Sequence, residues 1–372
     1  MRPLPLSVMQ LITGLDVGGA ERVVLDLSSE LLDENVEVMV GVVSTQREIL
    51  THRRDPRLTV ESLGIGKNPL LLPVALCHLV RLLHKHHVQV IHAHMFHALV
   101  LAMLCRLLKP SLRLVFTSHN TGASFGQVRR LFIRCTRRWR HADVIFTAGQ
   151  HPELNAACTK VIANGTQMKI AERVRLPAVP ARGKVIISVG RLFPQKDPMG
   201  LVSEFARLRH VDAELWLVGD GELRAELTAK VAELGLTSRV KMLGVRHDVA
   251  DLLAQADLFV LGSAWEGMPI AILEAGASGI PVLATPVGCV PDVLGEDCGY
   301  MAQRHQLAEA MDAILDDYDE ALVRAARLQQ RVHDDYSMQA MCRSHIAIYR
   351  HVTGSTDTRR PGTPTHRYQE VV

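Results

Sequence analysis

The sequence contains no uninterrupted run of about eighteen apolar residues, the length that a membrane-spanning helix needs, so we expect no such helix. The apolar N-terminal stretch lacks a small-residue cleavage site, which favours a first strand over a signal peptide. The seven cysteines are scattered and form no Cys-x-x-Cys pair, so neither a disulfide framework nor a zinc site is indicated, and we expect reduced thiols in a cytoplasmic protein. The net charge of only +3 gives no bulk indication of a nucleic-acid partner.

What the sequence does contain is enough apolar material for substantial cores. Of its 372 residues, 48% are hydrophobic and 22% are charged, which is typical of a globular chain long enough for two domains. Apolar strand-like runs alternate with helical periodicity, which indicates an α/β fold with doubly wound parallel sheets. In the first half, strands are expected at residues 7–13, 37–43, 58–63, 88–92, 112–117, 142–148 and 161–166.

The division into domains follows from composition. We expect an N-terminal domain over residues 1–175 and a C-terminal domain over residues 184–335, joined by a proline-rich linker at 176–183. A last helix is expected at 336–352. Residues 353–372 are rich in Thr, Arg and Pro without periodicity, which predicts a disordered tail.

One stretch of the second half carries the strongest functional signal. An apolar strand at 258–261 is followed by a Gly-Ser turn and by a helical pattern from Met268 to about Ser278. Pro269 suits the first turn of that helix, and Gly279 suits the position just past its end. A strand that enters a helix through a tight loop can bind an anion with backbone N–H groups. Glu266 and Glu274 flank this turn, eight positions apart, and would accept hydrogen bonds from hydroxyls. A nucleotide sugar carries both kinds of group.

The sequence S-A-W-E-G-M-P-I-A-I-L-E-A, with this spacing of glutamates, resembles the E-x7-E signature of the family 4 retaining glycosyltransferases. The resemblance covers roughly residues 7–350. It implies the GT-B fold, in which two Rossmann-like domains face a cleft and the last helix crosses back onto the first domain. It also implies that a sugar is transferred from a nucleoside diphosphate with retention at the anomeric carbon, by front-face attack and without a protein-bound metal.

A second loop in the C-terminal domain is expected to bind the diphosphate. Gly190 and Arg191 follow an apolar strand at 184–189, and Lys196 comes five positions later. Arginine offers a planar fork and lysine a mobile point charge, and both suit a diphosphate. The pattern G-R-L-x-x-x-K resembles the phosphate-binding loop of the family. Arg191 and Lys196 would neutralise the departing diphosphate, with N–H groups of Gly267, Met268 and Ile270 in support.

The resemblance assigns roles to further residues. Glu274 should accept from the ribose hydroxyls, and Glu266 should hold a hydroxyl of the sugar. Val245 and Arg246 should lie beside the base or bond it through backbone groups.

In the N-terminal domain, the resemblance implies roles for Gly18, Gly19 and His119. Gly18 and Gly19 would approach the donor phosphates, although a tight turn is the simpler explanation of two glycines. His119 would contact the donor sugar, and a hydrogen-bonded loop histidine is the alternative.

Other polar residues receive structural expectations. His92, His94 and His97 are not read as metal ligands, because no carboxylate accompanies them, and we expect them at the rim of the cleft with His94 near an acceptor. Asp220 is expected to form the turn after its strand and to cap the helix that follows, and Asp248 is expected to cap the helix that begins at Val249. The sequence departs from the family pattern at residues 287–292 and 295–299, which leaves the donor sugar open.

Residues 127–141, QVRRLFIRCTRRWRH, predict a basic amphipathic helix. Arg129, Arg130, Arg134, Arg137, Arg138 and Arg140 have no acidic residue between them, and Trp139 adds apolar surface. This composition suits an anionic membrane surface. A solvated helix is the alternative. An RNA-binding patch is disfavoured because no RNA-binding signature is present.

The sequence therefore predicts a retaining glycosyltransferase that moves a hexose or N-acetylhexosamine from a UDP- or GDP-sugar to a glycan or lipid-linked acceptor, as in cell-surface polysaccharide or glycolipid synthesis. Its partners would be the nucleotide sugar, the acceptor and an anionic membrane surface. Three alternatives stay open: a soluble transferase acting on a small sugar or sugar phosphate, a nucleotide-sugar epimerase of GT-B fold, and a non-catalytic nucleotide-sugar-binding protein.

Overall fold

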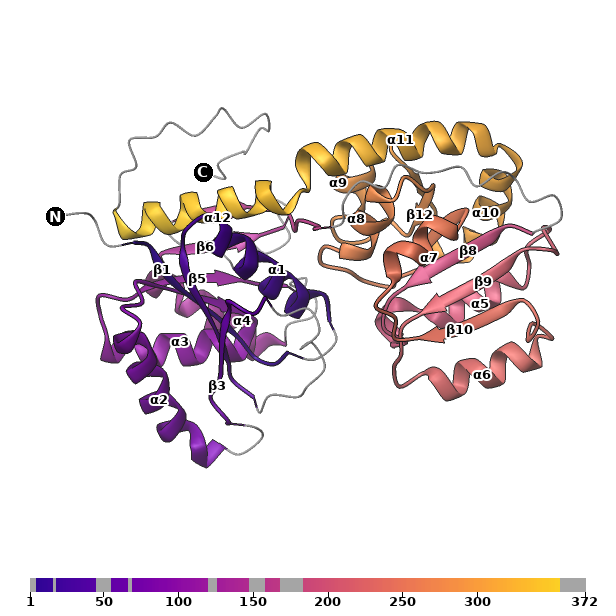
Figure 1. Ribbon diagram of the computed structural model, residues 1–372. Coiled ribbons are helices and arrows are strands. Elements are labelled where there is room, and N and C mark those ends of the chain that lie inside the picture. The colour runs from indigo at the N-terminus through magenta and orange to yellow at the C-terminus, as the bar shows by residue number, and fades with distance from the viewer. Residues whose placement is uncertain are drawn as a thin grey trace. The chain divides into compact units, whose positions relative to one another are not determined.

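The computed structural model describes residues 5–15, 18–44, 55–65, 69–119, 126–146, 158–167 and 183–354. The chain divides into two compact units. The first unit comprises residues 1–165 and 338–372, and the second comprises residues 166–337 (Figure 1). Most of the expected linker and of the expected tail lies outside the described residues.

In the first unit, the described residues form a seven-stranded parallel sheet in the order β3-β2-β1-β4-β5-β6-β7. The strands are β1 (Ser7–Ile12), β2 (Glu37–Val42), β3 (Thr59–Ser62), β4 (Val90–His94), β5 (Arg113–Thr117), β6 (Ala142–Ile145) and β7 (Thr159–Val161). The helices are α1 (Gly19–Asp33), α2 (Leu72–Lys85), α3 (Phe96–Leu108), α4 (Gln127–Cys135) and α12 (Met338–Thr353), with short 3-10 turns η2 (Pro69–Leu71) and η4 (Arg137–Trp139).

Strand β1 lies at the centre of this sheet and is buried along its whole length. Side chains alternate between the two faces of a strand. Met9 and Leu11 pack in the core that includes α2 and α3. Gln10 points to the other face, which α1 and α12 cover, and its side chain bonds Tyr349 of α12. A buried polar residue in the middle of an apolar strand requires such a partner.

In the second unit, a six-stranded parallel sheet has the order β10-β9-β8-β11-β12-β13 (Figure 1). Its strands are β8 (Val185–Val189), β9 (Glu214–Val218), β10 (Val240–Gly244), β11 (Leu258–Leu261), β12 (Val282–Ala284) and β13 (Tyr300–Met301). Its helices are α5 (Pro198–Phe205), α6 (Arg224–Glu233), α7 (Val249–Gln255), α8 (Ile270–Ala277), α9 (Val290–Leu294), α10 (Leu307–Asp316) and α11 (Tyr318–Asp335), with 3-10 turns η5 (Pro194–Lys196) and η6 (Arg304–Gln306).

Both sheets have the doubly wound order in which the chain reverses direction beside the first strand of the unit. The reversal lies between β1 and β4 in the first sheet and between β8 and β11 in the second. In open parallel sheets, ligands bind at this switch point, outside the carboxyl ends of the strands. The loops that follow β8 and β11, and those that follow β1, β4 and β5, are therefore the places to look for function.

The structure confirms most of the expected elements and corrects several boundaries. The strand expected at 258–261 is confirmed, and the strand expected at 184–189 is β8, Val185–Val189. Helix α8 begins at Ile270, not at Met268, because Pro269 occupies the N-cap with extended backbone. A strand expected at 161–166 is instead β7, Thr159–Val161. The expected continuous helix at 127–141 ends at Cys135, and the chain continues as a 3-10 turn.

Candidate functional site

The loop after β8 is held in place by the turn that follows β9. Leu192 N–H donates to the Asp220 carbonyl at 3.0 Å, and the Leu192 carbonyl accepts from Leu223 N–H at 3.1 Å. Gly219 has a φ of +132°, and a Cβ at this position would lie 2.0 Å from the Gly190 carbonyl oxygen. Only glycine combines this conformation with so close an approach. The Gly-Asp-Gly turn therefore supports the phosphate loop.

Asp220 lies in the turn where it was expected, but the prediction that it also caps the next helix is wrong. Helix α6 begins at Arg224, its N-cap position is Leu223, and no side chain caps it. The Asp220 carboxylate instead accepts from Gly221 N–H at 2.8 Å and pairs with Arg224 at 2.9 Å. These two contacts keep the Asp220 carboxylate in the turn that precedes α6.

Lys196 and Glu266, which were predicted separately, are brought together by the loops after β8 and β11. Lys196 Nζ lies 2.5 Å from Glu266 Oε1, and Ser263 Oγ donates to the same oxygen at 2.5 Å. Glu266 is only 4% exposed. Gln195 joins the two loops because its carbonyl accepts from Ala264 N–H at 2.8 Å and its side-chain amide donates to the Trp265 carbonyl at 3.1 Å. A buried carboxylate thus has a cation beside it at the switch point.

Sequence reasoning missed Ser263 and Gln195 as supports of Glu266. Gln195 lies directly before Lys196, and Ser263 lies three residues before Glu266, so their proximity in sequence was the available signal. Their role depends on the meeting of two loops that are about seventy residues apart, with Gln195 and Trp265 separated by 70 positions.

Arg191 is exposed and does not pair with any carboxylate in the described part of the chain. Its guanidinium lies 5.0 Å from the centroid of the Phe193 ring, within cation–π range. The aromatic ring steadies the guanidinium without neutralising it. Arg191 can therefore offer its full charge and its planar fork to a diphosphate.

The turn at the start of α8 is braced by the stretch that departs from the family pattern. Cys289 N–H donates to the Gly267 carbonyl at 3.0 Å. Gly288 has a φ of +58°, and a Cβ there would lie 2.4 Å from the Glu266 carbonyl oxygen. Glycine is therefore required at 288 although its neighbours differ from the family pattern. Since α8 begins at Ile270, Gly267 and Met268 belong to the preceding loop and not, as predicted, to the helix.

Glu274 lies inside α8 and is 3% exposed. The end of α8 is as expected, because Ser278 is its C-cap and Gly279 follows. Val245 and Arg246 follow β10, and Val245 is half exposed. Arg246 makes a bidentate pair with Asp248 at 2.7 and 2.5 Å.

The prediction that the Asp248 side chain caps α7 is wrong, because its carboxylate binds Arg246 although the residue occupies the N-cap position. This hydrogen bond from Arg246 holds the pKa of Asp248 below its usual range.

In the first unit, Gly18 is the N-cap of α1 and Gly19 is the first residue of the helix. Residues 16 and 17 lie outside the described part of the chain. The backbone of Gly18 is extended, with a φ of −163°, and the carboxylate of Glu21 folds against it. The two glycines thus stand at a helix start after β1, beside the switch point of the first sheet.

The expectation that His92 and His94 line a rim is wrong. Both lie in β4 and are at most 1% exposed, whereas His97 is exposed at the start of α3. His92 bonds Tyr349 Oη and Thr117 Oγ1, each at 2.7 Å. Burial holds the pKa of both histidines well below the usual value, so they are neutral. Among the described residues, no group of three or more His, Cys, Asp and Glu side chains could hold a metal ion.

His119 follows β5 and joins this buried group. Its Nε2 lies 2.9 Å from His94 Nδ1, and His94 Nε2 lies 2.7 Å from Gln10 Oε1. His119 itself is half-buried and its ring is near Phe146. Burial lowers the pKa of His119 to about 3. His119, which was predicted to contact a sugar, is therefore neutral, and its Nε2 is hydrogen-bonded to the buried His94.

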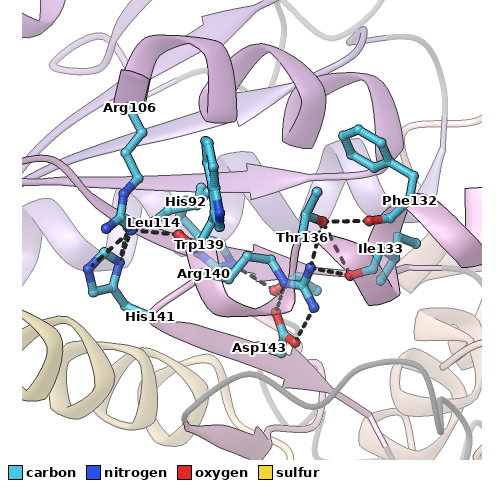
Figure 2. Close-up of polar contacts among 11 residues, drawn as sticks. His92, Arg106, Leu114, Phe132, Ile133, Thr136, Trp139, Arg140, His141 and Asp143 are labelled. Atoms are coloured by element: carbon cyan, nitrogen blue, oxygen red, sulfur yellow. Dashed lines mark hydrogen bonds and ion pairs between the residues drawn. The ribbon is translucent and has the colours of Figure 1, made fainter. Parts of the chain in front are cut away.

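The basic stretch divides into one buried and several exposed arginines, and Figure 2 shows the contacts of the buried one, Arg140. Arg140 is fully buried and pairs with Asp143 at 2.6 and 2.9 Å, and it also donates to the Ile133 carbonyl at 2.7 Å. Arg140 therefore has an acidic partner three residues away and serves the fold. The side chains Arg129, Arg130, Arg134, Arg137 and Arg138 are exposed, as are the apolar Val128, Leu131 and Trp139.

Two family models match the two halves of the chain. The model described as Glycosyltransferase Family 4 matches residues 17–169, and the model described as Glycosyl transferases group 1 matches residues 172–330. In the part of the chain that the structure describes, no helix has the length and apolarity needed to cross a bilayer.

Individual proteins extend the comparison. The chain is 27% identical to the UDP-Gal:alpha-D-GlcNAc-diphosphoundecaprenol alpha-1,3-galactosyltransferase of Escherichia coli, over 65% of this chain and 69% of that protein. It is also 27% identical to the lipopolysaccharide core biosynthesis mannosyltransferase LpsB of Rhizobium meliloti, over 83% of this chain and 93% of that protein. Matches to some other relatives span less than half of their length.

Among solved structures, Anabaena Alr3699/HepE in complex with UDP and glucose superposes with a TM-score of 0.79, over 92% of this chain and 98% of that chain, at 22% identity. This likeness shows the GT-B fold that the sequence predicted.

Proposed function

The chain belongs to the family 4 glycosyltransferases, and we propose that it transfers a hexose or N-acetylhexosamine from a UDP- or GDP-sugar to a glycan or lipid-linked acceptor in cell-surface polysaccharide or glycolipid synthesis. The observation that supports this most is the meeting of the Arg191–Lys196 loop with the Glu266 loop at the switch point of the second sheet. The names of the E. coli and R. meliloti relatives favour this kind of donor and acceptor.

Arg191 and Lys196 are the proposed cations for the diphosphate. Arg191 is exposed and uncompensated within the described chain, and Lys196 has three N–H donors of which Glu266 takes one. A diphosphate would therefore share the Lys196 ammonium with Glu266. Fixed cations that neutralise charge as it grows on a leaving group lower the barrier because they need no reorganisation during the reaction. They also supply the charge that a metal ion would otherwise contribute, so we propose no protein-bound metal.

Transfer is proposed to proceed with retention. The bond between the anomeric carbon and the diphosphate oxygen breaks, and the acceptor oxygen bonds to the same face of that carbon. The acceptor proton passes to the departing phosphate oxygen. No protein side chain is then needed as a general base.

The two buried glutamates are proposed to hold hydroxyls of the donor. Oε1 of Glu266 is occupied by Lys196 and Ser263, whereas Oε2 has only a 3.5 Å contact with Gln195. Oε2 can therefore accept from a sugar hydroxyl. Glu274, inside α8, would accept from the ribose.

Backbone groups and the first unit complete the proposed donor site. The backbone at Gly190, Gly267, Met268 and Ile270 would contact phosphate, and that at Val245 and Arg246 the base. On the first unit, Gly18 and Gly19 would approach phosphate, and His119 would contact the transferred sugar.

The exposed arginines of α4 and η4 are proposed to bind the anionic inner surface of a cell membrane. They alternate with exposed apolar side chains, since Val128 is 82% exposed, Leu131 62% and Trp139 43%. Each basic group near an anionic surface contributes on the order of 1 kcal/mol before screening by salt. A lipid-linked acceptor would be met at this surface.

Sedimentation with liposomes tests the membrane proposal. Liposomes that contain anionic lipid should bind the protein at low salt, and the double variant Arg137→Glu/Arg138→Glu should bind at least tenfold more weakly. Arg207→Glu/Arg209→Glu in the second unit is the matched control and should bind like wild type. Binding that is indifferent to salt and to the α4–η4 charges would refute the proposal.

Product analysis tests the catalytic proposal. The protein should release UDP or GDP from one donor of a panel only when an acceptor is present, and NMR of the product should show the anomeric configuration of the donor. Conversion of the donor without acceptor would establish the epimerase instead. Binding of the donor without any release would establish a non-catalytic binding protein, and transfer to a free sugar phosphate alone would establish the soluble transferase.

A further inference from the structure

We propose that a buried chain of hydrogen bonds in the first unit fixes the tautomer of His119, so that its Nδ1 offers a lone pair, and not a proton, to a hydroxyl of the transferred sugar. Gln10, His94 and Tyr349 thereby act as positioning residues. The identity of the ligand rests on the proposed function, whereas the tautomer does not.

The orientation of the Gln10 amide sets the donor and the acceptor of each hydrogen bond between Gln10 and His119. Its amide nitrogen donates to Tyr349 Oη at 3.0 Å, and its amide oxygen therefore receives the 2.7 Å hydrogen bond from His94 Nε2. Because a neutral imidazole has one N–H and one lone pair, His94 Nδ1 must be an acceptor. His119 Nε2, 2.9 Å away, must then carry the proton and donate it.

The hydrogen bonds between Gln10 and Thr117 run in the same direction. Tyr349 Oη already accepts from Gln10, so its own O–H is free to donate to His92 Nδ1 at 2.7 Å. His92 Nε2–H then donates to Thr117 Oγ1 at 2.7 Å. Each group between the two ends thus uses one donor and one acceptor, and all the hydrogen bonds run the same way from His119 to Thr117.

These hydrogen bonds require neutral imidazoles, and burial keeps the imidazoles neutral. His92 and His94 are buried, and burial together with the neighbouring histidines lowers the pKa of each. Burial also lowers the pKa of His119 to about 3 and that of His345, whose ring is 5.5 Å from that of His92, to about 4. A second proton on any of these rings would place a donor opposite a donor and break the chain.

The outer end of the chain is His119. It is half-buried just after β5, and within the described residues its Nδ1 has no hydrogen-bond partner. With Nε2–H committed to His94, Nδ1 can only accept. A hydroxyl donates readily to such a lone pair, so the chemistry recognised is a sugar O–H.

Helix α12 supplies the centre of the chain. Tyr349 and Gln10 are 339 residues apart in sequence, and their bond joins the last helix to the central strand of the sheet. Loss of any internal member leaves two buried polar groups without partners, which is unfavourable, so each internal side chain is needed for the hydrogen bonds on both sides of it.

Long-range ¹H–¹⁵N NMR of the histidines in the free wild-type protein tests the tautomer directly. We expect His119, His94 and His92 all to carry the proton on Nε2. The opposite orientation of the Gln10 amide reverses every hydrogen bond and places all three protons on Nδ1. That result, or a mixture of tautomers at His119, would overturn the proposal whether or not the protein is a transferase.

Substitutions at Gln10 separate positioning from general support of the fold. In Gln10→Glu, a carboxyl oxygen still accepts from His94, so His119 should keep its Nε2 proton. In Gln10→Leu this acceptor is lost, and the Nδ1 tautomer of His119 should appear. Gln329→Leu, which removes a glutamine bonded to backbone in the second unit, is the control and should leave His119 unchanged. An unchanged tautomer in Gln10→Leu would contradict the proposal.

Donor analogues test the consequence for recognition. Fluorine cannot donate a hydrogen bond, so at the hydroxyl that meets His119 the deoxy and fluoro donors should lose kcat/KM equally, by about five- to tenfold. In His119→Ala, the kcat/KM of the deoxy donor and that of the fluoro donor should both equal the kcat/KM of the natural donor. A fluoro donor that retains full activity beside an impaired deoxy donor would show that His119 donates and would overturn the assignment. These ratios require an active transferase, whereas the tautomer measurement does not.

Discussion

The switch points of the two sheets have the same strand order and opposite chemistry. In the second unit the loops present charge: an exposed Arg191 and a Lys196–Glu266 pair at 2.5 Å. In the first unit the end of β4 carries neutral side chains, with His92 and His94 buried and His92 bonded to Tyr349. Topology therefore sets where a site lies but not what it binds. Cations held in place suit a diphosphate, and directional neutral hydrogen bonds suit the orientation of a sugar.

Arg191→Ala should have the largest effect on catalysis, because it removes an uncompensated cation of the charged site. We expect kcat to fall by about two to three orders of magnitude, as for other groups that stabilise a developing anion. Steady-state kinetics measure this. Arg207→Ala, an exposed arginine paired with Glu204 in the same unit, is the control and should retain activity. If the turnover of Arg191→Ala were unchanged, the assignment of Arg191 to the diphosphate would be contradicted.

The neutral site should make the first unit sensitive to acid. The pKa of His119 is lowered to about 3 and that of His345 to about 4, so in the folded state both stay neutral while the unfolded chain takes up protons below about pH 6.5. Stability is therefore fully present above that pH and decreases as the pH falls toward 4. The slope approaches about 1.4 kcal/mol per pH unit for the fully buried His345, and is smaller for half-buried His119.

Hydrogen exchange of the two sheets between pH 7 and 5, corrected for intrinsic rates, measures this difference. Protection of β4 and β5 should fall more steeply than that of β8 and β11. His345→Gln should reduce the slope in the first unit by about one proton. Equal pH dependence of both sheets would contradict the contrast between a neutral and a charged site.

Lys196→Met should destabilise the second unit, because it leaves the buried Glu266 carboxylate without its cation. The Lys196 side chain is 20% exposed and Ser263 still donates to the carboxylate, so we expect a loss of about 1–3 kcal/mol in the free energy of unfolding. Adding Glu266→Gln should recover most of this stability but no activity. Denaturant unfolding checks the first statement and kinetics the second. If Lys196→Met unfolds like wild type, the pair does not stabilise the site.

Arg246→Ala should have the smallest effect. The side chain is held by Asp248 at the surface, and the loop is proposed to meet the base through its backbone. The KM for the donor should therefore change by less than about threefold, because exposed ion pairs contribute little. A larger increase in KM would mean that the Arg246 guanidinium itself contacts the base. The charged site of the second unit would then include the base as well as the diphosphate.

The sequence predicted the second unit better than the first, and the reason is the range of the contacts. The strand at 258–261 and the loop with Glu266 are short local patterns bounded by glycine, and both are confirmed. The family resemblance, which rested on E-x7-E, is confirmed as well. The burial of His92 was missed because its partner Tyr349 is 257 residues away.

Other errors concern competing partners. Asp220 and Asp248 were assigned to helix caps, but each carboxylate instead pairs with an arginine within four residues. The Arg140–Asp143 pair could have been found, since the two residues are three positions apart, yet the run of arginines drew attention to the surface. Burial, which decides such cases, is not local information.

Saturation-transfer NMR with a panel of UDP- and GDP-sugars, on wild type and on Glu274→Ala, tests the central claim most directly. We predict that a single donor binds to wild type, that ribose protons receive strong saturation, and that binding weakens in the variant because the buried ribose acceptor is lost. If no nucleotide sugar of the panel bound, or if wild type and Glu274→Ala bound the same donor equally, the donor site would not be at the switch point of the second sheet.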